Sequence, residues 1–244
     1  MAKIAANVTR QWIDEFPLAT EISGWTQDVN QETPVTTTLG VDGPRRVTAN
    51  YDHSIQFAGF FDGDGSAGLP DEEFWNILGD NATDHYMTVA MGQTIGDVAY
   101  TGGAALEAQP RSGAIAGAVL LNFTANGRTT LSRDAVLGLT TSTGAENLAG
   151  FEQGATTTPT TYRVVFRLIS FTGTSVTMNV EESSDDGSGD AYVVISGLTS
   201  GALSSPGVVV ATTTASTEAW KRIALSGTYS SAEIVVTAGA LAGE

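Results

Sequence analysis

The segment YRVVFRLISFTGTSVTMNVEESSDDGSGD, residues 162–190, carries the most regular pattern in the chain. Apolar side chains occupy every second position in two runs: Tyr162, Val164, Phe166 and Leu168, and then Val176, Met178 and Val180. A period of two predicts β-strands with one buried face. The acidic, glycine-rich residues from 183 to 190 predict a turn after the second strand.

Similar short apolar runs occur on both sides of this segment. They predict further strands at 47–61, 86–91, 114–123, 128–139, 192–195, 208–210, 221–224 and 234–237. Asn126-Gly127 fits a tight turn between two of them. Short strands at this spacing predict a mainly β protein, a β-sandwich or barrel.

One short α-helix is predicted beside the strands, at about residues 70–79. Pro70 suits the first helical position, and the acidic residues 71–73 suit the positive end of the helix dipole. Phe74, Trp75, Ile77 and Leu78 supply its apolar face.

We expect the 244 residues to form a single elaborated domain in four parts. Residues 1–50 are an N-terminal arm and extended loop, with Trp12, Ile13, Phe16 and Leu18 as anchors for the arm. Residues 51–139 hold the first strands and the helix. Residues 140–161 are a Thr/Gly-rich link, and residues 162–244 hold the C-terminal strands.

The charge balance is strongly acidic. Lys and Arg total 11 and Asp and Glu total 27, which gives a net charge of −16. Because binding to phosphates needs a basic surface, this balance disfavours a nucleic-acid-binding protein. The chain has no cysteine, which excludes disulfides and thiolate chemistry. No apolar run approaches the roughly 20 residues that span a bilayer, so no membrane partner is expected.

Residues 62–73, DGDGSAGLPDEE, resemble a calcium loop in their spacing. Asp62, Asp64, Ser66 and Glu73 stand at positions 1, 3, 5 and 12. A helix–loop–helix calcium site needs glycine at position 6, where this chain has Ala67, and the preceding residues alternate as a strand. We therefore interpret residues 62–68 as an acidic turn, with a weak, irregular cation site at the same four residues as the alternative.

No group of residues indicates catalysis. The two histidines, His53 and His85, each follow an aspartate, but adjacent residues on a strand point to opposite faces. We interpret both as partly exposed polar residues. There is no nucleophile-elbow or zinc-protease motif. The sequence predicts no enzyme activity, no catalytic or cofactor-binding residues and no cofactor.

Several short motifs resemble one known family. They are residues 21–24 (EISG), 36–40 (TTTLG), 59–62 (GFFD) followed by the predicted helix, and 171–177 (FTGTSVT) leading to 181–185 (EESSD). Together they resemble the major tail protein, or tail tube protein, of long non-contractile-tailed bacteriophages, over roughly residues 20–80 and 162–240. The sequence departs from the family pattern at 41–50 and at 140–161.

The resemblance implies a structural virion protein with a tail-tube-like fold. Its subunits would form hexameric rings that stack into the phage tail tube, the conduit for DNA during ejection. Implied partners are other copies of the chain, a tape-measure protein in the lumen, and tail terminator and tail-tip proteins. DNA would pass transiently without specific binding, past a negatively charged wall. Assembly would take place in the host bacterial cytoplasm, and the final location would be the virion tail.

Two other functions stay open at the level of sequence. One is a different virion β-sandwich module, a capsid decoration or tail-tip protein. The other is a carbohydrate-binding or adhesive β-sandwich that would use exposed aromatic residues. The candidates for that role are Trp12, Trp25, Trp75 and Trp220.

Overall fold

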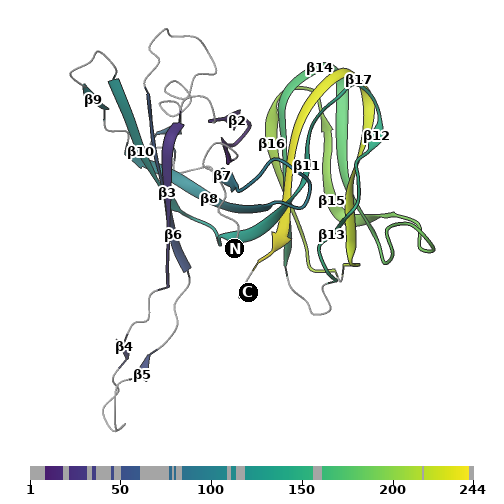
Figure 1. Cartoon of the computed structure of the whole chain (residues 1–244), viewed down its shortest axis with the longest axis horizontal. Helices are drawn as coiled ribbons and strands as arrows, with labels where there is room; N and C mark the ends of the chain where they lie inside the picture. Colours follow the sequence, from purple (N-terminus) through teal and green to yellow (C-terminus); the bar gives the residue numbers. More distant parts are fainter. Residues whose placement is uncertain are drawn as a thin grey trace. The chain divides into compact units, whose positions relative to one another are not determined.

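The computed structural model describes most of the chain, and every strand pairing in it is antiparallel. The described residues are 9–18, 22–31, 35–36, 45–46, 51–60, 77–78, 80, 84–108, 111–113, 119–155, 161–215 and 217–241. They form seventeen strands, so the prediction of a mainly β protein is confirmed (Figure 1).

The strands vary in length from two residues to more than twenty. They are β1 (Arg10–Ile13), β2 (Phe16–Pro17), β3 (Ile22–Gln31), β4 (Val35–Thr36), β5 (Arg45–Arg46), β6 (Tyr51–Phe60), β7 (His85–Ala90), β8 (Val98–Ala108), β9 (Arg111–Gly113), β10 (Val119–Gly127), β11 (Ser132–Ser142), β12 (Glu146–Asn147), β13 (Phe151–Glu152), β14 (Tyr162–Ser183), β15 (Val193–Leu203), β16 (Gly207–Thr213) and β17 (Trp220–Ala240).

The chain divides into two compact units. Unit 1 contains residues Met1–Thr20, Tyr86–Thr101 and Ser132–Glu244, and unit 2 contains Glu21–His85 and Gly102–Leu131. The expectation of one elaborated domain stays a prediction.

Unit 1 is built around the two longest strands, β14 and β17. They pair along almost their whole length and arch over together (Figure 1). The first half of β14 also pairs with β16, and its second half pairs with β15. Because both halves contribute to a single apolar core, the arch folds the strands into the two layers of a β-sandwich.

Glycines allow the arch. The β14–β17 register shifts between Leu168 and Ser170 and again on either side of Gly173. A Cβ on Gly173 would lie 2.5 Å from the Cα of Tyr229. Gly227 has a φ of 124°, and a Cβ there would lie 2.2 Å from the carbonyl oxygen of Ser175. Glycine is therefore required at both positions. The sequence predicts two separate strands within β14 and two within β17, whereas bulges let each continue through the bend.

The apolar core of the sandwich uses the alternation seen in the sequence. Tyr162, Val164, Phe166, Leu168, Val176, Met178 and Val180 are all buried in it, together with Ile223, Ile234, Val236 and others from the neighbouring strands. The opposite face of the first half of β14 is also buried. Arg163, Val165 and Arg167 on that face are at most 3% exposed.

The strands β1 and β2 and, from Tyr86 onward, β7 form part of unit 1. β1 pairs with both β2 and β7, and Trp12, Ile13 and Leu18 are buried. The predicted anchoring of the N-terminal arm is confirmed for these three residues, while Phe16 is only half-buried.

The predicted link at 140–161 is partly strand. β12 and β13 pair with β17, and the partly buried side chains of Leu148 and Phe151 pack against the apolar core. Those two apolar residues are too few to give a periodic pattern, so the sequence did not reveal the strands.

In unit 2 the strands lie in the order β8-β10-β6-β3, and β8 belongs to this unit from Gly102 onward. The short strand β9 pairs with β10. The rings of Phe57 and Phe123 stack with their centroids 4.7 Å apart. The separate β4 and β5 pair only with each other among the described residues.

The predicted turn at Asn126-Gly127 is wrong. Both residues belong to β10, where they pair with Ala105 and Ala104 of β8. Gly127 is needed for packing and not for a turn, because a Cβ there would lie 2.3 Å from the ring of His53.

The predicted helix lies almost entirely outside the described residues. Of residues 70–79 the structure describes only Ile77 and Leu78, and Asp80 N–H donates to the carbonyl of Ile77 over 3.1 Å. In the described part of the chain, no helix is long and apolar enough to cross a membrane.

Candidate functional site

The four residues of the alternative cation site, Asp62, Asp64, Ser66 and Glu73, lie outside the described residues. The acidic turn at 62–68 lies there too, so both interpretations stay predictions. Where the structure does describe side chains, no group of three or more His, Cys, Asp or Glu residues is arranged to hold a metal ion.

The second acidic turn, at 183–190, is described and is closed by its own hydrogen bonds. The carboxylate of Asp185 accepts backbone N–H bonds from Ser188, Gly189 and Asp190 at 2.6–3.0 Å. These bonds, the one from Asp190 first, lower the pKa of Asp185. Backbone donors therefore occupy the oxygens that a cation would need.

Both histidines are buried, which corrects the prediction that they are partly exposed. His53 is 3% exposed and His85 is 7% exposed. Cβ atoms on Gly102 and Gly127 would lie within 2.5 Å of the His53 ring, so the two glycines make room for it. His85 Nε2 lies 3.6 Å from a carboxylate oxygen of Asp80.

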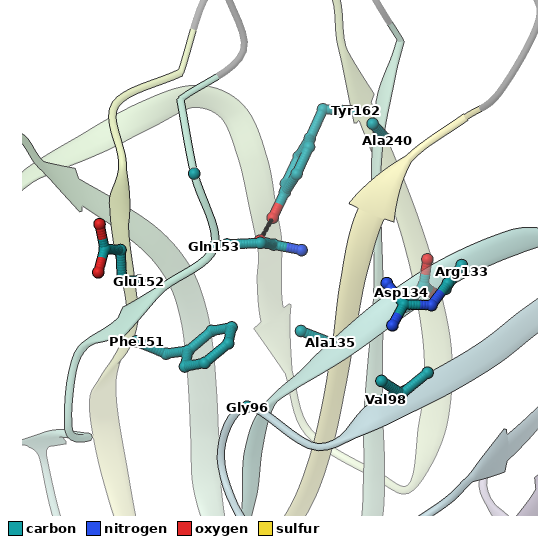
Figure 2. A pocket seen from close by; sticks show the side chains of 11 residues that line it. Gly96, Val98, Arg133, Asp134, Ala135, Phe151, Glu152, Gln153, Tyr162 and Ala240 are labelled. Atoms are coloured by element: carbon teal, nitrogen blue, oxygen red, sulfur yellow. Dashed lines mark hydrogen bonds between the residues drawn. The ribbon is translucent and has the colours of Figure 1, made fainter. Parts of the chain in front are cut away.

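Unit 1 contains a pocket of about 340 Å³. It opens between the β8–β11 pair and the segment 151–154 (Figure 2). The lining residues are Gly96, Val98, Arg133, Asp134, Ala135, Phe151, Glu152, Gln153, Gly154, Tyr162 and Ala240. None of the charged residues among them stands in a motif or a periodic pattern of the sequence.

A chain of hydrogen bonds crosses one wall of the pocket. The hydroxyl of Tyr162 donates to Oε1 of Gln153, as Figure 2 shows, and Nε2 of Gln153 donates to the carbonyl of Ala238 over 2.7 Å. Burial raises the pKa of Tyr162 well above its usual range, and the charge of Asp134 adds to this. The phenol therefore stays protonated and acts as a donor.

Lys221 lies beside this wall and is fully buried. Its Nζ donates to the carbonyl of Glu218 over 2.6 Å and lies 5.4 Å from the centre of the Tyr162 ring. Burial lowers the pKa of Lys221 to about 8, against the opposing effect of Glu182 and Glu218.

Asp134 is the most deeply buried charged residue in the pocket, at 3% exposure. Burial raises its pKa, and the positive charge of Arg163 works in the opposite direction. Arg163 donates 2.6 Å bonds to the carbonyl of Thr101 and to Oγ of Ser132. The strand β14 is thereby tied to β8 and β11 by one guanidinium group.

Arg167 also links β14 to neighbouring segments through hydrogen bonds from its guanidinium group. Its Nε donates to the carbonyl of Asp14 over 2.6 Å, and an Nη donates to the carbonyl of Tyr86 over 2.9 Å. Burial lowers the pKa of Arg167 to about 10, which leaves it charged at neutral pH. Both arginines share a strand face with Val165 and Ile169. Since arginines on a strand usually face solvent, the sequence pattern did not reveal that they are buried.

The pocket supplies charge and hydrogen bonds but no activated nucleophile. No Ser, Thr, Cys, Lys or His is among the described residues that line it, and its tyrosine is held protonated. What the arrangement does chemically is to hold strands in register through buried polar contacts.

The tryptophans proposed as sugar platforms are not equivalent. Trp12 is 3% exposed and cannot serve as one. Trp25 and Trp220 are half-buried, and Trp75 lies outside the described residues. Trp25 lines a groove of about 380 Å³ in unit 2, together with Phe57, Phe123 and five other residues.

No protein-family model matches the sequence, and no curated protein matches it. Several solved structures resemble the chain distantly. A chain of the virion of a native gene transfer agent particle is 18% identical, with a TM-score of 0.41, over 54% of this chain and 98% of that one. A chain of the SPP1 tail tube is 11% identical, with a TM-score of 0.42, over 55% and 80%.

The Dit (gp 19.1) protein of SPP1 matches over more of the sequence. It covers 96% of this chain and 99% of its own, with 14% identity and a TM-score of 0.36.

Proposed function

We propose that this chain is a structural protein of a bacteriophage tail, whose copies form stacked hexameric rings that make up the tail tube. The observation that carries the proposal is the set of family-like motifs at residues 21–24, 59–62 and 171–177. The described parts of these motifs lie on β3, on β6 and at the arch of β14. The described part of each motif is therefore in a β-strand, as a β-built tube wall would require.

The charge of the chain supports the same role. A net charge of −16 per copy would give a tube a strongly negative wall. DNA would be repelled from such a wall and would pass without adhering. We propose the tape-measure protein as the occupant of the lumen before ejection, and tail terminator and tail-tip proteins as partners at the two ends.

The polar interior of unit 1 suits a structural role better than a catalytic one. Arg163 and Arg167 use their donors on backbone carbonyls and a hydroxyl of neighbouring strands. These bonds hold the strands in one register. A subunit of a ring needs such a fixed structure, because it must present the same surface to every neighbour.

Electron microscopy of the purified chain at high concentration tests the proposal. We expect rings with sixfold symmetry and stacks of them. Isolated trimers or monomers that decorate capsids would instead support the alternative of a capsid or tail-tip module. Specific binding on a glycan array, lost when Trp25 or Trp220 is replaced by alanine, would support the carbohydrate-binding alternative.

A further inference from the structure

One long stretch of this acidic chain has no charge at all. The residues from Ala191 to Thr217 include none of the 27 Asp and Glu or 11 Lys and Arg residues, although Asp190 and Glu218 stand directly on either side. Surfaces of soluble proteins usually carry interspersed charges. A neutral stretch of this length therefore needs a structural reason.

The neutral stretch forms the outer strand of both layers of the sandwich. β15 runs along the second half of β14, and β16 runs along the first half. Among the described residues neither strand pairs with any other strand. Each therefore has one row of backbone N–H and C=O groups with no strand partner among the described residues, although Gly197 of β15 lies beside the carbonyl of Thr212 in β16.

The edge of β15 is interrupted in the ways that protect an edge strand. Its register with β14 shifts between Thr177 and Asn179 and again between Asn179 and Glu181. Gly197 and Gly201 have positive φ angles of 86° and 65°. Bulges of this kind twist an edge away from a flat partner strand.

The edge of β16 has no such protection. All seven of its residues pair with β14 in continuous register, from Gly207 opposite Leu168 to Thr213 opposite Tyr162. It has no charge, no proline and no bulge. Val208, Val209 and Val210 also give it high β-propensity. Natural proteins that stay monomeric blunt such an edge, so an open one indicates a partner.

The charge of the chain identifies the partner. Two copies that each carry −16 repel one another over most of their surfaces, and the repulsion is weakest along a neutral strand. A basic protein or peptide would instead be drawn to the acidic surfaces, where it gains attraction that β16 cannot offer. A neutral edge on an acidic chain is thus suited to another copy of the same chain.

We infer that β16 is an assembly edge, along which a second copy of this chain adds a β-strand. The inference rests on the proposed self-assembling function and specifies one surface for it. The added strand would complete the hydrogen bonds of β16 and extend the first layer of the sandwich. Val209 and Ala211 stay turned towards the apolar core, against which they pack.

A lysine placed on the edge tests the inference. Thr212 is an exposed residue of β16, so Thr212→Lys adds a charge to the edge without disturbing the core. The matched control is Thr172→Lys, at an exposed threonine of the β14 arch, which makes the same change in side chain and net charge. Circular dichroism and thermal unfolding would verify that both variants fold.

Sedimentation velocity over a range of concentrations measures the effect. We expect Thr212→Lys to raise the concentration at which half of the chain is assembled by about tenfold or more, and the control to shift it by no more than about twofold. As a second readout, hydrogen exchange at the β16 amides should slow on assembly of the wild type, while exchange at the bulged part of β15 changes little.

The outcomes separate this inference from the proposed function. If the wild type forms rings, both lysine variants assemble equally and β16 exchange is unchanged, the inference is wrong and the tail-tube proposal stands. If the wild type forms only small oligomers whose β16 amides are protected, the inference holds and the ring proposal fails. If the wild type stays monomeric at all concentrations, both fail.

Discussion

The two faces of the first half of β14 are both buried, but one face carries only apolar side chains and the other carries two arginines. Val164, Phe166 and Leu168 point into an apolar core. Arg163 and Arg167, on the alternate positions, point into an interior of hydrogen bonds and charge. One strand thus lies between an apolar core and a polar, hydrogen-bonded interior.

The apolar face and the polar face therefore act in different ways: one stabilises a compact arrangement, and the other selects which strands lie next to each other. Removal of apolar surface from water favours any compact arrangement, since the effect has no direction. A buried guanidinium is stable only where its donors meet acceptors, so it selects particular neighbours. The Arg163 and Arg167 bonds reach Thr101, Ser132, Asp14 and Tyr86, which come from distant parts of the sequence. The apolar face stabilises the sandwich, and we infer that the polar face fixes its strand order.

The largest effect is expected on the polar face. Arg163→Met removes the hydrogen bonds to Thr101 and Ser132 and leaves buried Asp134 without the stronger of its two positive neighbours, Arg163 and Arg167. We expect the free energy of unfolding, measured by urea denaturation, to fall by about 3–5 kcal/mol. The double variant Asp134→Leu with Arg163→Met should recover part of this loss, because no charge is then left unpaired. A loss below about 1 kcal/mol in the single variant would mean that the guanidinium does not stabilise this interior.

The apolar face should respond to lost volume alone. Leu168→Ala at its fully buried position is expected to lower the free energy of unfolding by about 3 kcal/mol. The control is Val194→Ala in β15, where the side chain is 52% exposed and the cost should stay within about 0.5 kcal/mol. Equal losses at the two sites would contradict the assignment of the core.

A smaller effect is expected from the hydroxyl groups of the polar interior. Thr101 Oγ1 lies 3.0 Å from Oγ1 of Thr88 and 3.3 Å from Oγ1 of Thr237, and all three residues are fully buried. Thr101→Val keeps the shape of the side chain but removes its hydrogen bonds. We expect a loss of about 1–2 kcal/mol in urea denaturation. The same change at the exposed Thr172 should have almost no effect, and an equally small effect at Thr101 would show that the hydroxyl chain adds nothing.

The last effect is a change of stability with pH. The pKa of Lys221 is lowered to about 8, below its ordinary value of 10.5, so the unfolded chain binds more protons between these values. The stability contributed by this residue should therefore rise as the pH increases from about 8 towards 10.5. Lys221→Met removes the titrating group. The difference in melting temperature between wild type and variant should change across this range, and a constant difference would contradict the burial of the amine.

The sequence predicted those parts of the fold that depend on local pattern. Alternation located the strands at 86–91 and in the last third of the chain, and the apolar face of β14 followed directly from it. It did not predict that β14 and β17 continue through their bends, because that depends on how closely Gly173 and Gly227 approach the opposite strand.

The polar interior was also out of reach of pattern analysis. Arginines on one face of a strand usually indicate that the face is solvated, and only the strands packed over it show that Arg163 and Arg167 are buried. Asp134 gave no signal in the sequence, since its effect depends on the charge of Arg163. The four residues of the alternative cation site stay a prediction.

Self-assembly is the central claim, and electron microscopy of the purified wild-type chain at increasing concentration tests it most directly. We predict rings with sixfold symmetry that stack into tubes as the concentration rises, with sedimentation velocity showing the matching loss of monomer. A chain that stays monomeric in both measurements at every concentration would contradict the account.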